Sequence, residues 1–106
     1  IVLEIAKRFA PSVELNYNRH YIGFLINGRP LNFAVCKPQK NGMKLEVRLP
    51  QSEECDEILN NSNIDMLDYD KRWGNYRLKL TKNSLSEAEG EGVLYPLLKQ
   101  AYELRV

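Results

Sequence analysis

Histidine and cysteine are scarce in this chain. Its 106 residues include one histidine, His20, and two cysteines, Cys36 and Cys55, which do not form a CxxC pair. A structural zinc site takes about four ligands from these two residue types, so the sequence argues against one. No secretory feature points to an oxidising compartment, so we expect both cysteines to be free thiols. No cofactor is predicted.

Long apolar runs are also absent. No stretch approaches the ~20 residues that span a bilayer, and no signal peptide is visible. We therefore expect a cytoplasmic protein with no membrane partner. The chain opens on Ile1, and an apolar pattern typical of a helix begins at that residue. We therefore interpret these 106 residues as the C-terminal part of a longer chain. An upstream domain of that chain is then an expected partner.

No familiar set of catalytic residues occurs. A pairing of His20 with Cys36 or Asp70 would need an orienting group and an oxyanion site, which no stretch supplies. Asp65, Asp68 and Asp70 lack the spacing and the closing glutamate of a calcium loop. We therefore interpret His20 as a strand-end residue, and we expect no metal site and no enzymatic activity of this domain alone.

The stretch from residue 20 to residue 49 organises the rest of the sequence. Its apolar runs are bounded by Asn27-Gly28 and Asn41-Gly42, and an Asn-Gly pair is a strong hairpin signal because both residues tolerate positive φ. With 106 residues, 43% of them hydrophobic, the chain fits one domain, 1–106, with one core. We predict a three-stranded antiparallel meander at its centre.

The length of the second turn decides which residues the predicted sheet buries. A two-residue loop at Asn41-Gly42 would split the apolar residues between both faces. We therefore favour a three-residue loop, 40–42, with Gly42 at positive φ in a bulge and Val35 opposite Val47. The predicted core face is Ile22, Phe24, Leu31, Phe33, Val35, Leu45, Val47 and Leu49, and the opposite face is Tyr21, Gly23, Asn32, Ala34, Cys36, Lys44, Glu46 and Arg48.

Helices and further strands flank the meander. Apolar spacing predicts helices over 1–10 and 93–104, and Ser52 before a run of acids predicts a helix over 53–61. Residues 12–18 suit either a short edge strand or an extended connector, whereas 75–81 alternate as a clear strand. The expected fold is α+β: an antiparallel sheet of about four strands with helices mainly on one face.

Charge is segregated along the chain, although the formal net charge is only +1. Residues 37–49 hold four bases and one acid, 53–70 hold seven acids and no base, and 71–82 hold five bases and no acid. The basic segments fall on predicted strands, so the face opposite the core is expected to attract phosphates. The alternative is that these charges only keep exposed strands from pairing with other molecules.

Trp73 follows two bases of the last basic segment. An aromatic residue beside bases is typical of a stacking platform for single-stranded nucleic acid. The other interpretation is a core or rim tryptophan, which is common for so large an apolar side chain. The candidate nucleic-acid contacts are Lys44, Arg48, Lys71, Arg72, Trp73, Arg77 and Lys79.

The whole chain resembles a bacterial and archaeal domain family whose members are often labelled predicted transport protein. The resemblance lies in HYIGF at 20–24, NFAVCKPQKNGMKLEVRL at 32–49, WGNYRLKL at 73–80 and LLKQAYE at 97–103. Similar domains lie at the C-terminal ends of larger proteins, including restriction-type and nuclease-like ones. The resemblance therefore implies an accessory domain. The transport label finds no support in the sequence, because no stretch of residues would span a membrane.

Two functions from different classes follow. The first is a non-catalytic accessory domain whose basic sheet face contacts nucleic acid for a larger restriction- or nuclease-type protein. The second is a protein-interaction or scaffolding module. A nuclease-like region upstream of Ile1 would favour the first, and a sensor or repeat array would favour the second.

Overall fold

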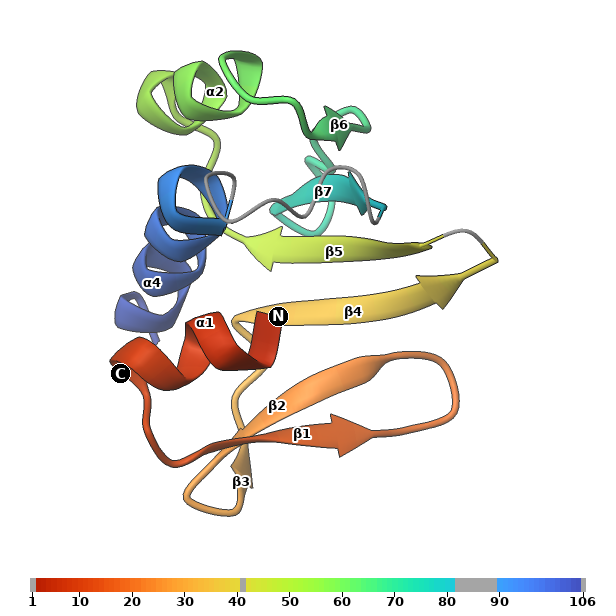
Figure 1. The fold of residues 1–106 in the computed structure, drawn as a ribbon, viewed down its shortest axis with the longest axis vertical. Coiled ribbons are helices and arrows are strands. Elements are labelled where there is room, and N and C mark those ends of the chain that lie inside the picture. The colour runs from red at the N-terminus through yellow and green to blue at the C-terminus, as the bar shows by residue number, and fades with distance from the viewer. Residues whose placement is uncertain (1, 41, 82–89, 106) are drawn as a thin grey trace.

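The computed structural model describes residues 2–40, 42–81 and 90–105 as a mixed α/β fold (Figure 1). Within these ranges the helices are α1 (Val2–Phe9), α2 (Glu53–Asn60) and α4 (Tyr95–Glu103), with a π-helical turn η1 (Gly90–Leu94) before α4. The strands are β1 (Val13–Tyr17), β2 (Ile22–Ile26), β3 (Arg29–Pro30), β4 (Ala34–Gln39), β5 (Gly42–Arg48), β6 (Asp65–Met66) and β7 (Asn75–Leu80).

The strands form one antiparallel sheet in the order β1-β2-β4-β5-β7-β6, with β3 paired to β2. The sheet has seven strands, so the expected number of about four was wrong. Residues 12–18 were expected to form either a short edge strand or an extended connector. In the structure Val13–Tyr17 form β1, which pairs with β2. Strands β3 and β6 have two residues each, too few for alternation to be visible in a sequence.

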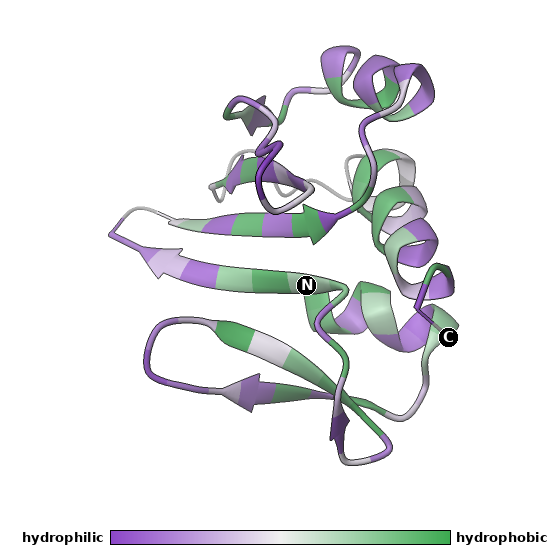
Figure 2. Cartoon of the chain, turned by 180° about the vertical axis from the view of Figure 1, so that it is seen from behind, coloured by the Kyte–Doolittle hydropathy of each residue, from purple (hydrophilic) through white to green (hydrophobic). Residues whose placement is uncertain are grey.

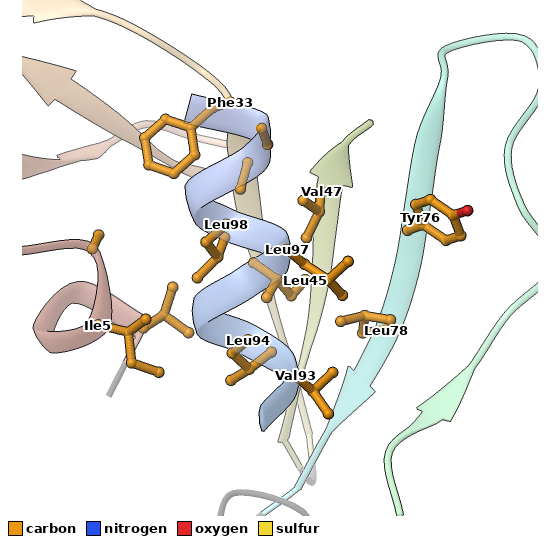
Figure 3. Close-up of a cluster of buried hydrophobic side chains, with 14 of the residues drawn as sticks. Ile5, Phe33, Leu45, Val47, Tyr76, Leu78, Val93, Leu94, Leu97 and Leu98 are labelled. Carbon is orange, nitrogen blue, oxygen red and sulfur yellow. The ribbon is translucent and has the colours of Figure 1, made fainter. Parts of the chain in front are cut away.

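The core lies between the sheet and the helices α1 and α4. Figure 3 shows Leu94 and Leu98 of the C-terminal helical segment on the side of Ile5, and Leu97 on the side of Leu45. An aromatic cluster closes one end of this core. Its members are Phe9, Phe24, Phe33 and Tyr102, with ring centroids 4.8 Å apart for Phe24 and Phe33 and 5.6 Å apart for Phe33 and Tyr102.

Helix α2 begins as predicted at Ser52. The Ser52 hydroxyl accepts a hydrogen bond from the Cys55 amide at 3.1 Å, which satisfies one of the free amides of the first turn. Tyr76 of β7 joins this cap to the sheet: its hydroxyl accepts from the Ser52 amide at 2.9 Å and donates to the Asp56 carboxylate at 2.8 Å. The helix is therefore held against β7 at its N-terminus.

The first turn of the meander has the predicted two-residue loop. Leu25 pairs with Pro30 and Ile26 with Arg29, and both loop residues have positive φ, 53° at Asn27 and 78° at Gly28. Two successive positive φ angles match the right-handed twist of the flanking strands. The Asn27-Gly28 pair alone was therefore enough to predict the length of this turn.

Residues 31–33 interrupt the path from β3 to β4. Beyond them Ile22 pairs with Cys36, so β4 is displaced by three residues from the register that the first turn sets. The side chain of Asn32 fills the interruption, because its Oδ1 accepts a hydrogen bond from the Phe24 amide at 3.2 Å. An odd displacement reverses which side chains face the core.

The second turn is one residue shorter than predicted. Gln39 pairs with Gly42 and Val35 with Glu46, so the loop consists of residues 40 and 41, of which Asn41 lies outside the described residues. The predicted three-residue loop and the pairing of Val35 with Val47 were wrong. Gly42 has a φ of 156°, and it is the first residue of β5 rather than a bulge in the turn.

These two changes correct the predicted faces of β4. Ala34 and Cys36 face the core, and Val35 faces away from it, the reverse of the expectation. The assignment of Leu45 and Val47 to the core and of Lys44, Glu46 and Arg48 to the other face holds, since β5 is uninterrupted. Figure 2 shows this alternation of hydrophobic and hydrophilic residues along β5.

Candidate nucleic-acid interface

Alternate residues of β4, β5 and β7 form the sheet face away from the core, called the outer face below. Across β5 and β7, Lys44 pairs with Lys79, Glu46 with Arg77, and Arg48 with Asn75. The outer face consists of Val35, Lys37, Lys44, Glu46, Arg48, Asn75, Arg77 and Lys79. It therefore carries four of the predicted contact residues, contributed by two neighbouring strands.

A pocket of about 380 Å³, called the outer pocket below, opens on this face. Its volume lies in the range of roughly 300–1,000 Å³ that is usual for sites of small ligands. It is lined by Tyr21, Val35, Lys37, Lys44, Glu46, Arg48, Asp70, Trp73, Asn75 and Arg77. Of the predicted contacts, the structure thus brings Lys44, Arg48, Trp73 and Arg77 together.

The floor of the outer pocket contains three buried residues. Val35, Glu46 and Asn75 are 9%, 7% and 6% exposed. The carboxylate of Glu46 forms an ion pair with the ammonium group of Lys37 at 2.9 Å. A carboxylate and an amide at the centre of a basic surface give the pocket acceptors as well as cations.

Asn75 has an unusual environment among the residues that the structure describes. Its Oδ1 is buried and has no hydrogen-bond partner. An unpaired buried acceptor costs roughly 1–3 kcal/mol, and few such groups occur in a folded domain. Among the residues that the structure describes, no donor reaches this buried oxygen.

The centre of the outer face differs from the expected surface. The predicted register placed Gly23, Ala34 and Cys36 on this face, where their small size would have left its centre low and smooth. Ala34 and Cys36 lie on the core side. At Gly23 a side chain would meet Asn32 and Tyr21, so these two residues already cover that position. The expectation of a smooth centre was wrong because it assumed an uninterrupted strand.

Trp73 stands on a tightly hydrogen-bonded loop between Asp70 and β7. Asp70 and Asn75 pair across the loop, and the Asp70 Oδ1 accepts from the amides of Arg72 at 3.1 Å and Trp73 at 3.2 Å. Gly74, with a φ of 70°, donates to the Asp70 carbonyl at 2.8 Å. Trp73 is 65% exposed, so it lies at the rim rather than in the core.

The remaining predicted contacts lie around the pocket. Lys71 and Arg72 are exposed on the same loop, and the Arg72 guanidinium carbon lies 5.3 Å from the Trp73 ring centroid. Lys79 is exposed further along β7. Arg77 has a structural contact too, because its Nε and Nη2 donate to the Asp68 carbonyl at 3.0 and 2.8 Å.

Sequence reasoning missed several lining residues: Tyr21, Lys37, Asp70 and Asn75. Tyr21 had been placed on the non-core side, and the alternation of residues 75–81 puts Asn75 on the same side as Arg77 and Lys79. Nothing in that alternation distinguishes a buried pocket residue from a solvated one. The signal at Asp70 was its position two residues before Arg72 and three before Trp73, which is typical of an aspartate that accepts from the next amides. Lys37 was missed because the register of β4 was wrong.

Both cysteines are buried, and no metal-holding cluster of side chains is found in the described part of the chain. Cys36 and Cys55 are free thiols, as predicted, and both are buried, although Cys36 had been expected on the face opposite the core. Burial raises the pKa of the Cys36 thiol to about 11, which keeps it protonated at neutral pH. Within residues 2–40, 42–81 and 90–105, no group of three or more His, Cys, Asp or Glu side chains is arranged to hold a metal ion.

None of the helices in these ranges is long and apolar enough to cross a bilayer. A search of curated proteins and a search of solved structures each found no match to the chain. The comparison with family models did find one, the model of DUF5655, a domain of unknown function, over residues 2–105. Since that match covers nearly the whole chain, the protein belongs to the DUF5655 family.

Proposed function

We propose that this domain is a non-catalytic module that binds single-stranded nucleic acid through its outer face. The observation that carries the proposal is the convergence of Lys44, Arg48 and Arg77 with an exposed tryptophan around one pocket. The resemblance to domains at the C-terminal ends of restriction-type and nuclease-like proteins supports an accessory role in a larger cytoplasmic protein. The upstream part of such a protein would then perform the chemistry.

The charge of the outer pocket favours an anionic ligand. Its lining holds four cations, Lys37, Lys44, Arg48 and Arg77, and two carboxylates, Glu46 and Asp70. Both carboxylates have partners, since Glu46 pairs with Lys37 and Asp70 accepts from backbone amides. Lys71, Arg72 and Lys79 extend the positive surface on two sides. Phosphates gain free energy from such a surface, largely through released counterions.

The exposed tryptophan favours a single strand over a duplex. Stacking of an unpaired base on an aromatic ring contributes roughly 1–3 kcal/mol, and in a duplex the faces of the bases are already stacked on one another. Because hydrogen bonds to Asp70 fix the backbone at Trp73, the ring is presented without a large cost of ordering the loop. The same loop carries Lys71 and Arg72 toward the flanking phosphates.

The test is a titration of labelled oligonucleotides, followed by fluorescence anisotropy at several salt concentrations. The variant Lys44→Ala/Arg48→Ala removes two cations that line the pocket. The control, Lys7→Ala/Arg29→Ala, removes one lysine and one arginine from exposed positions on α1 and β3. Both variants change the net charge equally, so only the location of the removed charges differs.

We expect tighter binding of single strands than of duplexes, with an affinity that falls steeply as salt rises. In the pocket variant, the slope of log affinity against log salt should decrease by about 0.7 for each phosphate that the protein no longer neutralises. The control variant should keep the slope of the original protein. If no oligonucleotide binds at tens of micromolar, or if both variants behave alike, the domain is instead a protein-interaction module.

A further inference from the structure

We propose that the free edge of β1 (Val13–Tyr17) binds a second copy of this chain, with the two β1 strands paired antiparallel about Leu15. The proposal goes beyond nucleic-acid binding, because no residue of β1 lines the outer pocket. It gives a partner to an edge of the sheet that the described part of the chain leaves open.

Strand β1 lies at one edge of the sheet, where β2 is its partner (Figure 1). The Asn18 amide donates to the Tyr21 carbonyl at 3.1 Å, which fixes the alternation of the ladder between the two strands. Residues that bond to β2 alternate with residues whose peptide groups point away, so those of Leu15 and Tyr17 point outward. Among the described residues, neither has a hydrogen-bond partner on that side.

Strand β1 also lacks the features that usually keep an exposed edge from pairing. Natural edges are protected by very short strands, bulges, proline or lysine. The opposite edge strand, β6, has only two residues, and one of them is Asp65. Strand β1 has five residues, pairs with β2 without a bulge, contains neither proline nor lysine and has Glu14 as its one charge. Such an edge is a template for another strand.

The sequence of β1, VELNY, is complementary to itself when two copies run antiparallel. Outward-pointing residues must face one another, and pairing about Leu15 is the register that uses the whole strand. Leu15 then exchanges hydrogen bonds with Leu15 of the second copy, and the Tyr17 amide donates to the Val13 carbonyl of that copy. The Val13 amide takes no part, because it already donates to the Ala10 carbonyl at 3.0 Å.

The side chains fit the same register. Glu14 lies opposite Asn16 of the second copy, so no like charges meet. On the other side of the strand, where Val13 is buried, Tyr17 lies opposite Val13 of the second copy. Tyr17 is 72% exposed in the single chain, and the second copy covers part of its ring. A second copy therefore matches this edge in hydrogen bonds, in charge and in apolar contact.

The dimer is expected to be weak. One five-residue strand from each copy is far smaller than the roughly 20–30 residues a side of a standard stable interface. We therefore expect a dissociation constant on the order of 100 µM. In sedimentation equilibrium between about 10 and about 500 µM, the apparent mass should rise from that of one chain toward that of two.

Amide hydrogen exchange, followed by NMR over the same concentrations, locates the contact. The amides of Leu15 and Tyr17 should exchange about twofold to threefold more slowly at the highest concentration than at the lowest, because the second copy occupies them. The Asn16 amide points toward β2, so its exchange rate should not depend on concentration.

Charge tests the register. Asn16→Glu places a second carboxylate opposite Glu14 of the other copy, and it should raise the dissociation constant about tenfold. The double variant Glu14→Lys/Asn16→Glu places opposite charges across the contact and should restore association. The matched control, Gln39→Glu at an exposed position of β4, makes the same change in net charge and should leave association unchanged.

Each failure has a distinct meaning. A mass of one chain at every concentration would overturn the dimer and leave this edge to a strand of another protein. Association without slower exchange at Leu15 and Tyr17, or without rescue in Glu14→Lys/Asn16→Glu, would overturn the assignment to β1. Nucleic-acid binding is measured separately by the anisotropy titration, so either proposal can fail while the other stands.

Discussion

Glu46 and Asn75 are buried polar residues on the outer face of a sheet whose other side packs against helices. A buried carboxylate must be paired to be tolerated, and Lys37 provides that partner at 2.9 Å. The Oδ1 of Asn75 has no such compensation among the described residues. Residues that are unfavourable for folding are often found at functional sites. Buried polar residues in the lining of the outer pocket are therefore consistent with a binding role for that pocket.

Gly42 is a residue at which a single methyl group should be costly. A Cβ there would overlap the carbonyl oxygen of Leu80 on the neighbouring strand β7. We expect Gly42→Ala to lower the free energy of unfolding by about 1–3 kcal/mol, since a strand must shift to make room. Urea unfolding followed by circular dichroism measures the change.

Gly28→Ala is the matched control for that substitution. Gly28 also has a positive φ, 78°, but nothing lies within 4 Å of the added Cβ. Its cost should be about 1 kcal/mol and should come only from backbone conformation. Equal losses of stability in the two variants would contradict the clash with Leu80.

At the scale of elements, the loop between Asp70 and β7 matters most for the candidate site. Four backbone amides converge on Asp70: those of Arg72 and Trp73 on its carboxylate, and those of Gly74 and Asn75 on its carbonyl. This arrangement holds an exposed tryptophan in place without burying it. A preordered aromatic ring binds a base with less loss of conformational entropy.

The second prediction concerns Asp70. Asp70→Ala removes the acceptor for the two loop amides, and we expect faster local motion of the Trp73 ring, seen as a lower fluorescence anisotropy of this single tryptophan. Affinity for single strands should fall about threefold to tenfold while the salt slope stays nearly unchanged.

Asp70→Asn serves as the control, because its amide oxygen still accepts hydrogen bonds from the loop amides. It should preserve both the anisotropy and most of the affinity. If Asp70→Asn reduces affinity as much as Asp70→Ala does, the charge of Asp70 rather than the shape of the loop is what matters.

At the scale of the whole molecule, the core contains two ionisable side chains, Cys36 and Tyr76, that burial keeps in their neutral, protonated form. Cys36 faces the core, and burial raises the pKa of its thiol from 9.0 to about 11. Burial likewise raises the pKa of the Tyr76 hydroxyl to about 12, helped by its hydrogen bond to Asp56. Both groups are therefore protonated throughout the neutral range.

The third prediction is a loss of global stability in alkali. Above pH 9 an unfolded Cys36 loses a proton that the folded protein retains, so stability is complete below pH 9 and falls as pH rises toward 11. A pKa difference of this size corresponds to about 2–3 kcal/mol. Urea unfolding between pH 8 and pH 10.5 should show the decline.

Cys36→Ala tests the cause of that decline. The substitution lowers stability at every pH because the sulfur no longer packs in the core, but it should make the dependence on pH above 9 shallower. Parallel curves for the original protein and the variant would show that Cys36 is not the group responsible.

Local chemistry was enough to predict a large part of this fold. The Asn27-Gly28 turn, the Ser52 cap of α2 and the alternation of β7 each depend on residues that are close in the chain. The α+β class followed because helical and strand periodicities occur in separate segments. That both thiols are free was predicted as well, from the lack of any secretory feature, but the burial of Cys36 was not, because the predicted register placed it on the face opposite the core.

The sequence by itself thus determined the class of fold, most element positions and the basic character of β5 and β7. Only the tertiary structure decided the register of β4. The hydrogen bond from the Phe24 amide to Asn32 makes the three-residue interruption tolerable. That bond joins segments that are not adjacent in the chain, so local sequence does not reveal it. The same holds for the outer pocket. Tyr21, Glu46 and Trp73 come from three separate segments, and whether they meet depends on strand pairing rather than on local composition.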